Sequence, residues 1–310
     1  MRAGIVQRTQ KQPRPKGLFV GLATVDILYT VEEIPGRDEK ISVPAQQLSA
    51  GGPATNAAAT FAALGGRAEL VTAVGLHPLA AVISGDLRRH SVRLRDVAGR
   101  RREIPPVSSI MVVRESGERS VVSANAAVFF GLPGDFDPAW LRSASILLVD
   151  GHYMPLCLAA ARQGRERRIP VVLDSGSWKE GMAELLPLVD IAICSESYRP
   201  PGCRDRKDVF EFLEARNIRQ IAITSGASPI ELHDHGRRGR VPIEKIRPVD
   251  TLGAGDILHG AFCYHTCQPG TSFRDAVVRA ARVASFSCQF PGTREWMEMQ
   301  VLGIRGQGPG

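Results

Sequence analysis

The sequence has few aromatic residues, no long apolar stretch and no regular cysteine spacing. Aromatic side chains make up 6% of the 310 residues. They are not interleaved with the basic clusters, which argues against a nucleic-acid-binding protein. No apolar run approaches the ~20 residues that a membrane-spanning helix needs, so we expect no membrane partner. The six cysteines lack paired spacing, which is typical of free thiols in a reducing compartment and predicts a cytoplasmic protein.

The N-terminus also lacks the apolar segment of a secretory signal. Residues 1–16 carry five basic residues and no acid, and they account for most of the formal net charge of +7. We expect a disordered basic tail over 1–16, a folded domain over 17–302 and a flexible tail over 303–310. The remaining positive charge would help to attract an anionic substrate such as a nucleotide.

Short β-rich runs alternate with helical patterns in the second half of the chain. The runs at 145–150, 169–174, 190–195 and 219–226 are apolar and short, and amphipathic or apolar helical segments separate them. Buried strands that alternate with helices are typical of a parallel sheet covered on both faces. We therefore expect an α/β fold with a mostly parallel sheet.

The first half of the chain interrupts this alternation. The segments at about 38–48 and 105–125 resemble exposed strands, and the second contains the turn signal ESGER between two β-rich arms. We interpret them as a small β-sheet that projects from the main domain. Such a sheet beside a cleft could act as a lid, and the alternative is an edge hairpin without a function.

One stretch, VDTLGAGDILHGAF at 249–262, combines a strand-like start with small residues, an acid and an apolar helix. Gly253, Ala254 and Gly255 let consecutive backbone N–H groups point at one spot, where the helix N-terminus adds positive potential. This pattern predicts an anion hole suited to a phosphoryl group in transfer. Asp256 could then accept the proton of an attacking hydroxyl. The alternative is an acid that only caps the helix.

The chain contains neither a Walker A motif nor a G-x-G-x-x-G fingerprint. Instead, DTLGAGD resembles the C-terminal signature of the PfkB, or ribokinase-like, carbohydrate kinases, and GGPATNAAATFAALGG at 51–66 resembles their N-terminal signature. The similarity extends from about Leu18 to Gly292. It implies a ribokinase-like α/β domain with a β-lid, Mg-ATP as donor and a sugar as acceptor. It also implies Asp256 as the catalytic base and 253–255 as the anion hole.

The resemblance assigns further residues to the acceptor. Asp26, expected at the end of the first strand, matches an acid that binds sugar hydroxyls, although an acid that caps a turn is the alternative. Gly51 and Gly52 would let the backbone approach the sugar, and Asn56 would offer a donor and an acceptor to a hydroxyl. Arg119 would face the site from the lid, unless it is an exposed turn residue. The resemblance is also compatible with a bound monovalent cation, and it implies a homodimer formed through the lid strands.

On the nucleotide side, ITSGASP resembles the turn that wraps ATP, so Thr224 and Gly226 are predicted to contact the nucleotide. The segment ICSESY aligns with a stretch that reads Asn-x-x-Glu in many members and helps to organise magnesium. Here Ser195 replaces the asparagine and Tyr198 the glutamate, while Glu196 remains. We expect Glu196 to take part in magnesium binding indirectly.

The acceptor is the least determined property. The TLGAGD loop and the altered asparagine resemble the ketohexokinase, fructokinase and sulfo-sugar kinase members, so a ketose such as fructose is our first expectation. Pro53 stands where ketohexokinases carry a substrate-contacting asparagine, so ribose or a nucleoside stays open. A non-catalytic sugar-sensing relative is the second hypothesis, and the intact Asp256 argues against it. His259 is expected to pack against the sheet.

Overall fold

The computed structural model describes residues 14–43, 46–115, 117–125 and 134–304. Its main sheet has the strand order β13-β12-β11-β10-β9-β8-β1-β4-β5. The pairs from β11 through β5 are parallel, whereas the β11–β12 and β12–β13 pairs are antiparallel. The strands are β1 (Lys16–Val20), β4 (Arg67–Thr72), β5 (Val92–Asp96), β8 (Ile146–Val149), β9 (Val171–Ser175), β10 (Ile191–Ser195), β11 (Gln220–Ser225), β12 (Ser228–Asp234) and β13 (Arg237–Val241).

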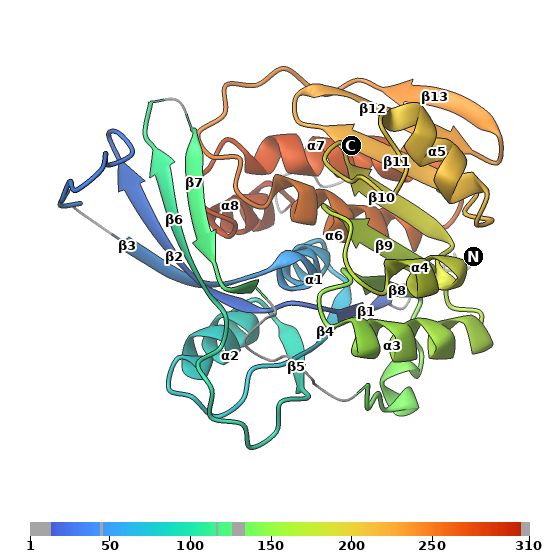
Figure 1. Cartoon of the computed structure of the whole chain (residues 1–310), viewed down its shortest axis with the longest axis horizontal. Coiled ribbons are helices and arrows are strands. Elements are labelled where there is room, and N and C mark those ends of the chain that lie inside the picture. The colour runs from blue at the N-terminus through green and yellow to red at the C-terminus, as the bar shows by residue number, and fades with distance from the viewer. Residues whose placement is uncertain (1–13, 44–45, 116, 126–133, 305–310) are drawn as a thin grey trace, which may run out of the picture.

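Helices cover both faces of this sheet, as the alternating pattern predicts (Figure 1). Alternate residues of the buried strands point to opposite faces: Phe19 joins one hydrophobic core, while Leu18 and Val20 join the other. On the first face lie α1 (Pro53–Ala63), α2 (Ala80–Arg89), α6 (Ala254–Thr266), α7 (Phe273–Ser287) and α8 (Glu295–Ile304). On the second lie α3 (Met154–Glu166), α4 (Met182–Leu185) and α5 (Arg206–Glu214). The expected α/β fold is confirmed.

A second sheet, which we call the lid, stands beside the main domain at the left of Figure 1. Its strand order is β3-β2-β6-β7, with β2 and β6 parallel and the outer pairs antiparallel. The strands are β2 (Thr24–Val31), β3 (Gln46–Gly51), β6 (Val107–Val113) and β7 (Arg119–Ser123). Leu28, Ile110 and Val112 on one face pack with Leu252 of the loop before α6. The lid therefore touches the segment that carries the predicted anion hole.

The strands of the lid differ from our expectation. The hairpin within 105–125 is confirmed. Of the strand expected at about 38–48, residues 38–43 form no strand and β3 begins at Gln46, while the lid also takes 24–31. The chain leaves β1 after Val20 because the backbone N–H of Leu22 turns to the Asp150 carboxylate, at 2.8 Å. Asp26 thus lies within the second strand and not at the end of the first.

Both domain ends also differ slightly from the expected boundaries. Lys16 begins β1 rather than ending a tail, and its Nζ lies 3.0 Å from Glu69 Oε1 and 2.8 Å from the Trp140 carbonyl. Helix α8 runs to Ile304. Residues 1–13 and 305–310 of the expected tails, and 44–45 of the expected lid strand, lie outside the described residues.

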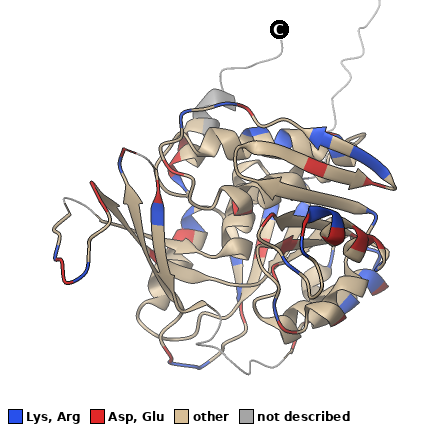
Figure 2. Cartoon of the chain, turned by 45° about the horizontal axis from the view of Figure 1, so that its top comes forward, with Lys and Arg blue, Asp and Glu red and all other residues tan. Residues whose placement is uncertain are grey.

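Two further expectations concern membranes and thiols. In the described ranges, no helix combines the length and apolar character that a membrane crossing requires. All six cysteines are free thiols. Lys and Arg are interspersed with Asp and Glu over helices and loops (Figure 2).

Candidate active site

The predicted anion hole lies at the start of α6. Gly253 caps the helix with φ 67° and ψ 9°, a left-handed conformation that favours glycine. A side chain there would also press on Thr293, with Cβ only 2.7 Å from its Cγ2. By contrast, a Cβ on Gly255 would meet no atom within 4 Å. The first N–H groups of a helix have no acceptor inside it. Gly255 borders open space, where its N–H is suited to an anion, whereas the Ala254 N–H is shared with the Thr251 carbonyl at 3.3 Å.

Asp256 stands in the first turn of α6 beside this space. Its Oδ2 accepts a 2.7 Å hydrogen bond from Nδ2 of Asn56. Burial first, and the nearby charge of Asp174 second, raise the pKa of Asp256 to about 7, although the Asn56 hydrogen bond and His259 act to lower it. A carboxyl group with a pKa near neutrality can exchange a proton under physiological conditions, as a general base must.

Asn56 reaches Asp256 because α1 and α6 pack closely. A Cβ on Gly260 would overlap the backbone carbonyl of Ala57, so only glycine allows this approach. The other end of the amide, Asn56 Oδ1, accepts from Nη1 of Arg294 at 2.9 Å. The structure thus joins Asn56 to Asp256, the predicted base. Arg294 was missed in the sequence, where no local pattern distinguishes it from a surface arginine.

Asp26 lies on the inner face of the lid and is 7% exposed. Burial raises its pKa, while hydrogen bonds from Thr24 and Ser108 oppose that effect; the Thr24 hydroxyl donates at 2.5 Å. Asp26 borders a cavity of about 290 Å³. Its other lining residues are Leu28, Gln47, Leu48, Ser49, Asp86, Arg89, His90, Leu252, Pro291, Gly292, Thr293, Arg294, Glu295 and Glu298.

The two glycines of the N-terminal signature serve close contacts within the protein. A Cβ on Gly51 would overlap the Asp26 carboxylate, and one on Gly52, where φ is 98°, would overlap the Leu22 carbonyl. Beside them, Asp150 Oδ2 accepts from the N–H groups of Leu22 and Ala54, at 2.8 and 3.2 Å. Asp26 therefore occupies the space next to Gly51 that we expected for a sugar. It fits there because Gly51 has no side chain.

Arg119 begins β7 and reaches across to the loop before α6. Its Nη1 donates to the carbonyl of Thr251 at 2.7 Å and lies 3.2 Å from the Thr251 hydroxyl. The Arg119 side chain is exposed, but these contacts bind it to Thr251. Arg119 therefore connects the lid to the anion-hole loop, which a free turn arginine would not do.

The predicted nucleotide residues meet at the carboxyl ends of β10 and β11. The Thr224 hydroxyl donates to the Cys194 carbonyl at 3.3 Å, and Gly226 turns the chain into β12 with φ 50°. The Thr224 carbonyl accepts from the N–H of Glu196 at 2.8 Å. Hydrogen bonds from Ser225 and Arg206 lower the pKa of Glu196.

The contacts of Glu196 bear on its predicted indirect role in magnesium binding. Its carboxylate accepts from Arg206 Nη2 at 2.8 Å and from the Ser225 hydroxyl at 2.5 Å, so it is directed to the protein. Tyr198, which replaces the family's glutamate, is fully buried. Over the described ranges, no group of three or more His, Cys, Asp or Glu residues gathers as a metal site.

His259 packs under the start of α6, as expected, but it is not a passive core residue. Its Nδ1 lies 2.7 Å from the Gly255 carbonyl and its Nε2 lies 3.0 Å from the Ile193 carbonyl. The Asp174 carboxylate lies 3.4 Å from Nδ1 of His259. Burial is the main cause that raises the pKa of Asp174.

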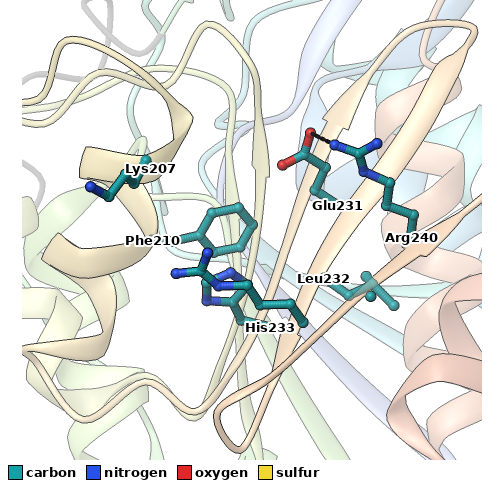
Figure 3. A pocket seen from close by; sticks show the side chains of 8 residues that line it. Lys207, Phe210, Glu231, Leu232, His233 and Arg240 are labelled. Atoms are coloured by element: carbon teal, nitrogen blue, oxygen red, sulfur yellow. Dashed lines mark ion pairs between the residues drawn. The ribbon is translucent and has the colours of Figure 1, made fainter.

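A second cavity, of about 380 Å³, opens between α5 and the β12–β13 hairpin (Figure 3). Its lining includes Lys207, Phe210, Glu231 and Arg240, and Glu231 forms an ion pair with Arg240 at 3.6 Å. It lies on the α5 side of the sheet and contains no residue of either signature. The predicted anion hole and base at α6 therefore lie outside this cavity.

The described geometry agrees with comparisons to known proteins. Residues 15–299 match the pfkB family of carbohydrate kinases. A ribokinase from Arabidopsis thaliana is 26% identical over 297 residues, which cover 90% of this chain and 77% of that protein.

Solved structures share the fold. The structure of ribokinase from Giardia lamblia has a TM-score of 0.75 at 17% identity, covering 92% of this chain and 99% of that one. The Arabidopsis thaliana ribokinase structure complexed with ribose and ATP has a TM-score of 0.71 at 22% identity, covering 95% and 99%. Because the family match spans nearly the whole sequence, the chain belongs to the pfkB family of carbohydrate kinases, which are phosphotransferases with an alcohol group as acceptor.

Proposed function

We propose that the chain transfers the γ-phosphoryl group of ATP to a hydroxyl of a small neutral sugar, with ribose as the first candidate. The observation that carries this proposal is the placement of Asp256, with its pKa near 7, beside the open N-terminus of α6. The relatives described above are named ribokinases, and one was solved with ribose and ATP. They favour ribose over the ketose that the sequence first suggested.

The cavity beside Asp26 supports a monosaccharide. At about 290 Å³ it lies at the lower end of the roughly 300–1,000 Å³ that small-molecule sites occupy. None of its lining residues is Phe, Tyr or Trp, so it offers no aromatic platform for a nucleoside base. Its acids are Asp26, Asp86, Glu295 and Glu298, against the cations Arg89 and Arg294. This excess of carboxylates favours a neutral polyol over an acidic or phosphorylated sugar.

In this proposal, different residues act on the sugar and on ATP. Asp26 accepts hydrogen bonds from acceptor hydroxyls and orients the sugar. The backbone N–H groups at Ala254 and Gly255 stabilise the charge on the migrating phosphoryl group. Asp256 takes the proton of the attacking hydroxyl, and closure of the lid excludes water that would otherwise hydrolyse ATP. Thr224 and Gly226 lie where the nucleotide would be held.

Magnesium and a monovalent cation stay predictions. The donor set fits an ion that arrives with the ATP phosphates, since Mg²⁺ commonly keeps several waters and one or two protein carboxylates. Asp174 is a candidate carboxylate, because its buried Oδ2 has no hydrogen-bond partner and lies 3.4 Å from His259 Nδ1. Bound there, the ion would neutralise phosphate charge. Asp250 already joins the loops around the site, because its carboxylate accepts from the N–H groups of Leu252 and Gly292, both at 2.8 Å.

A homodimer through the lid is also part of the proposal. The edge strands β3 and β7 carry exposed apolar side chains, with Leu48 51% and Val122 69% exposed. Exposed apolar edges favour association. We expect sedimentation velocity to give a dimer that Leu48→Lys with Val122→Lys converts to monomers. A wild-type monomer at micromolar concentration would contradict this part.

The acceptor is tested by measuring ADP release with ribose, fructose, adenosine and ribose 1-phosphate. We expect kcat/KM for ribose to exceed that for fructose by roughly tenfold or more, because a site built to bind particular hydroxyls discriminates against a sugar that misplaces them. Adenosine and ribose 1-phosphate should be poorer still. Highest activity with fructose would restore the ketose interpretation, and highest activity with adenosine would make the chain a nucleoside kinase.

A further inference from the structure

Arg294 is a largely buried arginine, and each of its three side-chain nitrogens faces an acceptor of the protein. Its side chain is 12% exposed. Nε lies 3.2 Å from Oδ2 of Asp86, and Nη2 donates to the Ala50 carbonyl at 2.8 Å. Nη1 lies 2.9 Å from Asn56 Oδ1 and 3.0 Å from the Thr293 hydroxyl. With its donors engaged in this way, the guanidinium group is poorly placed to bind a substrate and well placed to hold its neighbours.

The Asn56 amide has two different ends, and its neighbours decide which way it points. Arginine only donates, so it requires the acceptor Oδ1. The donor Nδ2 must then face Asp256, where it makes the 2.7 Å hydrogen bond. A hydrogen bond donated to the ionised carboxylate favours the ionised form. If the amide turned over, Oδ1 would face Asp256 and would favour the protonated acid, which is unable to act as a base.

We propose that Arg294 is a positioning residue that fixes the orientation of the Asn56 amide and thereby keeps Asp256 able to accept a proton. Asp86, whose side chain is 6% exposed, holds Arg294 in place from α2. A chain of contacts thus runs from α2 through the segment after Gly292 and through α1 to the start of α6. The inference rests on the proposed function, because it takes Asp256 as the base.

Other charged groups face this chain. Asp256 is faced by Asp174 from β9, by Asp26 from β2 and by His259 from α6. At the C-terminal end of α2, His90 lies 3.5 Å from Asp86. Burial first, and the charge of Arg294 second, lower the pKa of His90. Removing Arg294 therefore raises the pKa of His90, so the comparison is repeated in a His90→Asn background.

The test compares the pH dependence of kcat/KM for wild type and Arg294→Met, measured by ADP release with the best acceptor. We expect the acidic limb of the profile to move upward by about one pH unit, because one hydrogen bond to the ionised carboxylate is lost. At pH 7 activity should fall roughly fivefold, because the ionised fraction of the base drops from about one half to about one tenth, and it should recover toward pH 9. Arg294→Lys, which retains a donor, should restore part of the shift. The matched control Arg165→Met removes an exposed arginine that pairs with Asp190 and should leave the profile unchanged.

A double-mutant cycle separates positioning from a merely structural role. In an Asn56→Ala background the amide is absent, so adding Arg294→Met should produce no further movement of the acidic limb. The loss of Arg294 leaves the Asp86 carboxylate without this ion-pair partner. If the Arg294→Met variant unfolds for that reason, the double variant Arg294→Met with Asp86→Asn, which also removes the carboxylate charge, is used instead. An unmoved acidic limb, or equal movement in both backgrounds, would overturn the inference. Full turnover by Asp256→Asn would instead overturn the proposed function.

Discussion

Asp256→Asn is expected to lower kcat by roughly 10³-fold, the middle of the range that general acid–base catalysis contributes. The asparagine has nearly the same shape and still accepts the Asn56 hydrogen bond, but it takes up no proton from the acceptor hydroxyl. ADP release measures the loss, and calorimetric titration should show ATP binding within about threefold of wild type, because the N–H groups of Ala254 and Gly255 remain. Wild-type turnover by this variant would exclude Asp256 as the base.

The same substitution should stabilise the free protein at alkaline pH, and this serves as a folding control. The pKa of Asp256 is about 7 in the folded chain, above its ordinary value of 3.8. As the pH rises from about 4 to 7, the unfolded chain gives up this proton before the folded chain does, so the wild type loses stability across that window. The Asp256→Asn variant has no titrating group at this position, so it does not lose stability across this pH window. We expect a gain on the order of 2 kcal/mol at pH 8 that vanishes near pH 4, measured by urea unfolding. A variant less stable than wild type at pH 8 would show that its inactivity reflects damage to the fold.

Asp26→Ala is expected to lower kcat/KM for the acceptor by roughly 10²- to 10³-fold, since hydrogen bonds to charged groups contribute about 1.5–3 kcal/mol each. The Kd for ATP should change little, because Asp26 belongs to the lid and lies next to the 290 Å³ cavity. Initial-rate kinetics with each substrate varied in turn separate the two effects. An equal loss of ATP affinity would contradict the assignment of Asp26 to the acceptor.

Gly51→Ala should reproduce this phenotype with Asp26 still present, because the added methyl group would displace the carboxylate. Gly85→Ala is the matched control: it makes the same change on α2, where a Cβ meets no atom within 4 Å. It should leave acceptor kinetics unchanged and, within a helix, stabilise by about 0.5–1 kcal/mol. If Gly51→Ala behaved like Gly85→Ala, the close contact with Asp26 would have no part in binding the acceptor.

The features that sequence predicted correctly are local ones. The alternation of apolar runs and helices predicted the covered parallel sheet, and ESGER predicted the β6–β7 hairpin. The small residues of TLGAGD predicted where α6 begins, since the left-handed Gly253 and the helix start at Ala254 depend on neighbouring residues alone. The apolar pattern did not reveal that 24–31 form a lid strand, because strands of both sheets carry apolar residues. The turn in which the Leu22 N–H bonds to Asp150 separates this strand from β1.

The fold class, the family and the acid at the start of α6 follow from the amino-acid sequence, because each depends on neighbouring residues or on the two signatures. The surroundings of that acid follow only from the packing of distant segments. Asn56 and Arg294 stand far from Asp256 in the chain and meet it through the close packing of α1 on α6 at Gly260. Such contacts, and the pKa that they set, depend on which distant surfaces are buried together, and no local pattern contains that information.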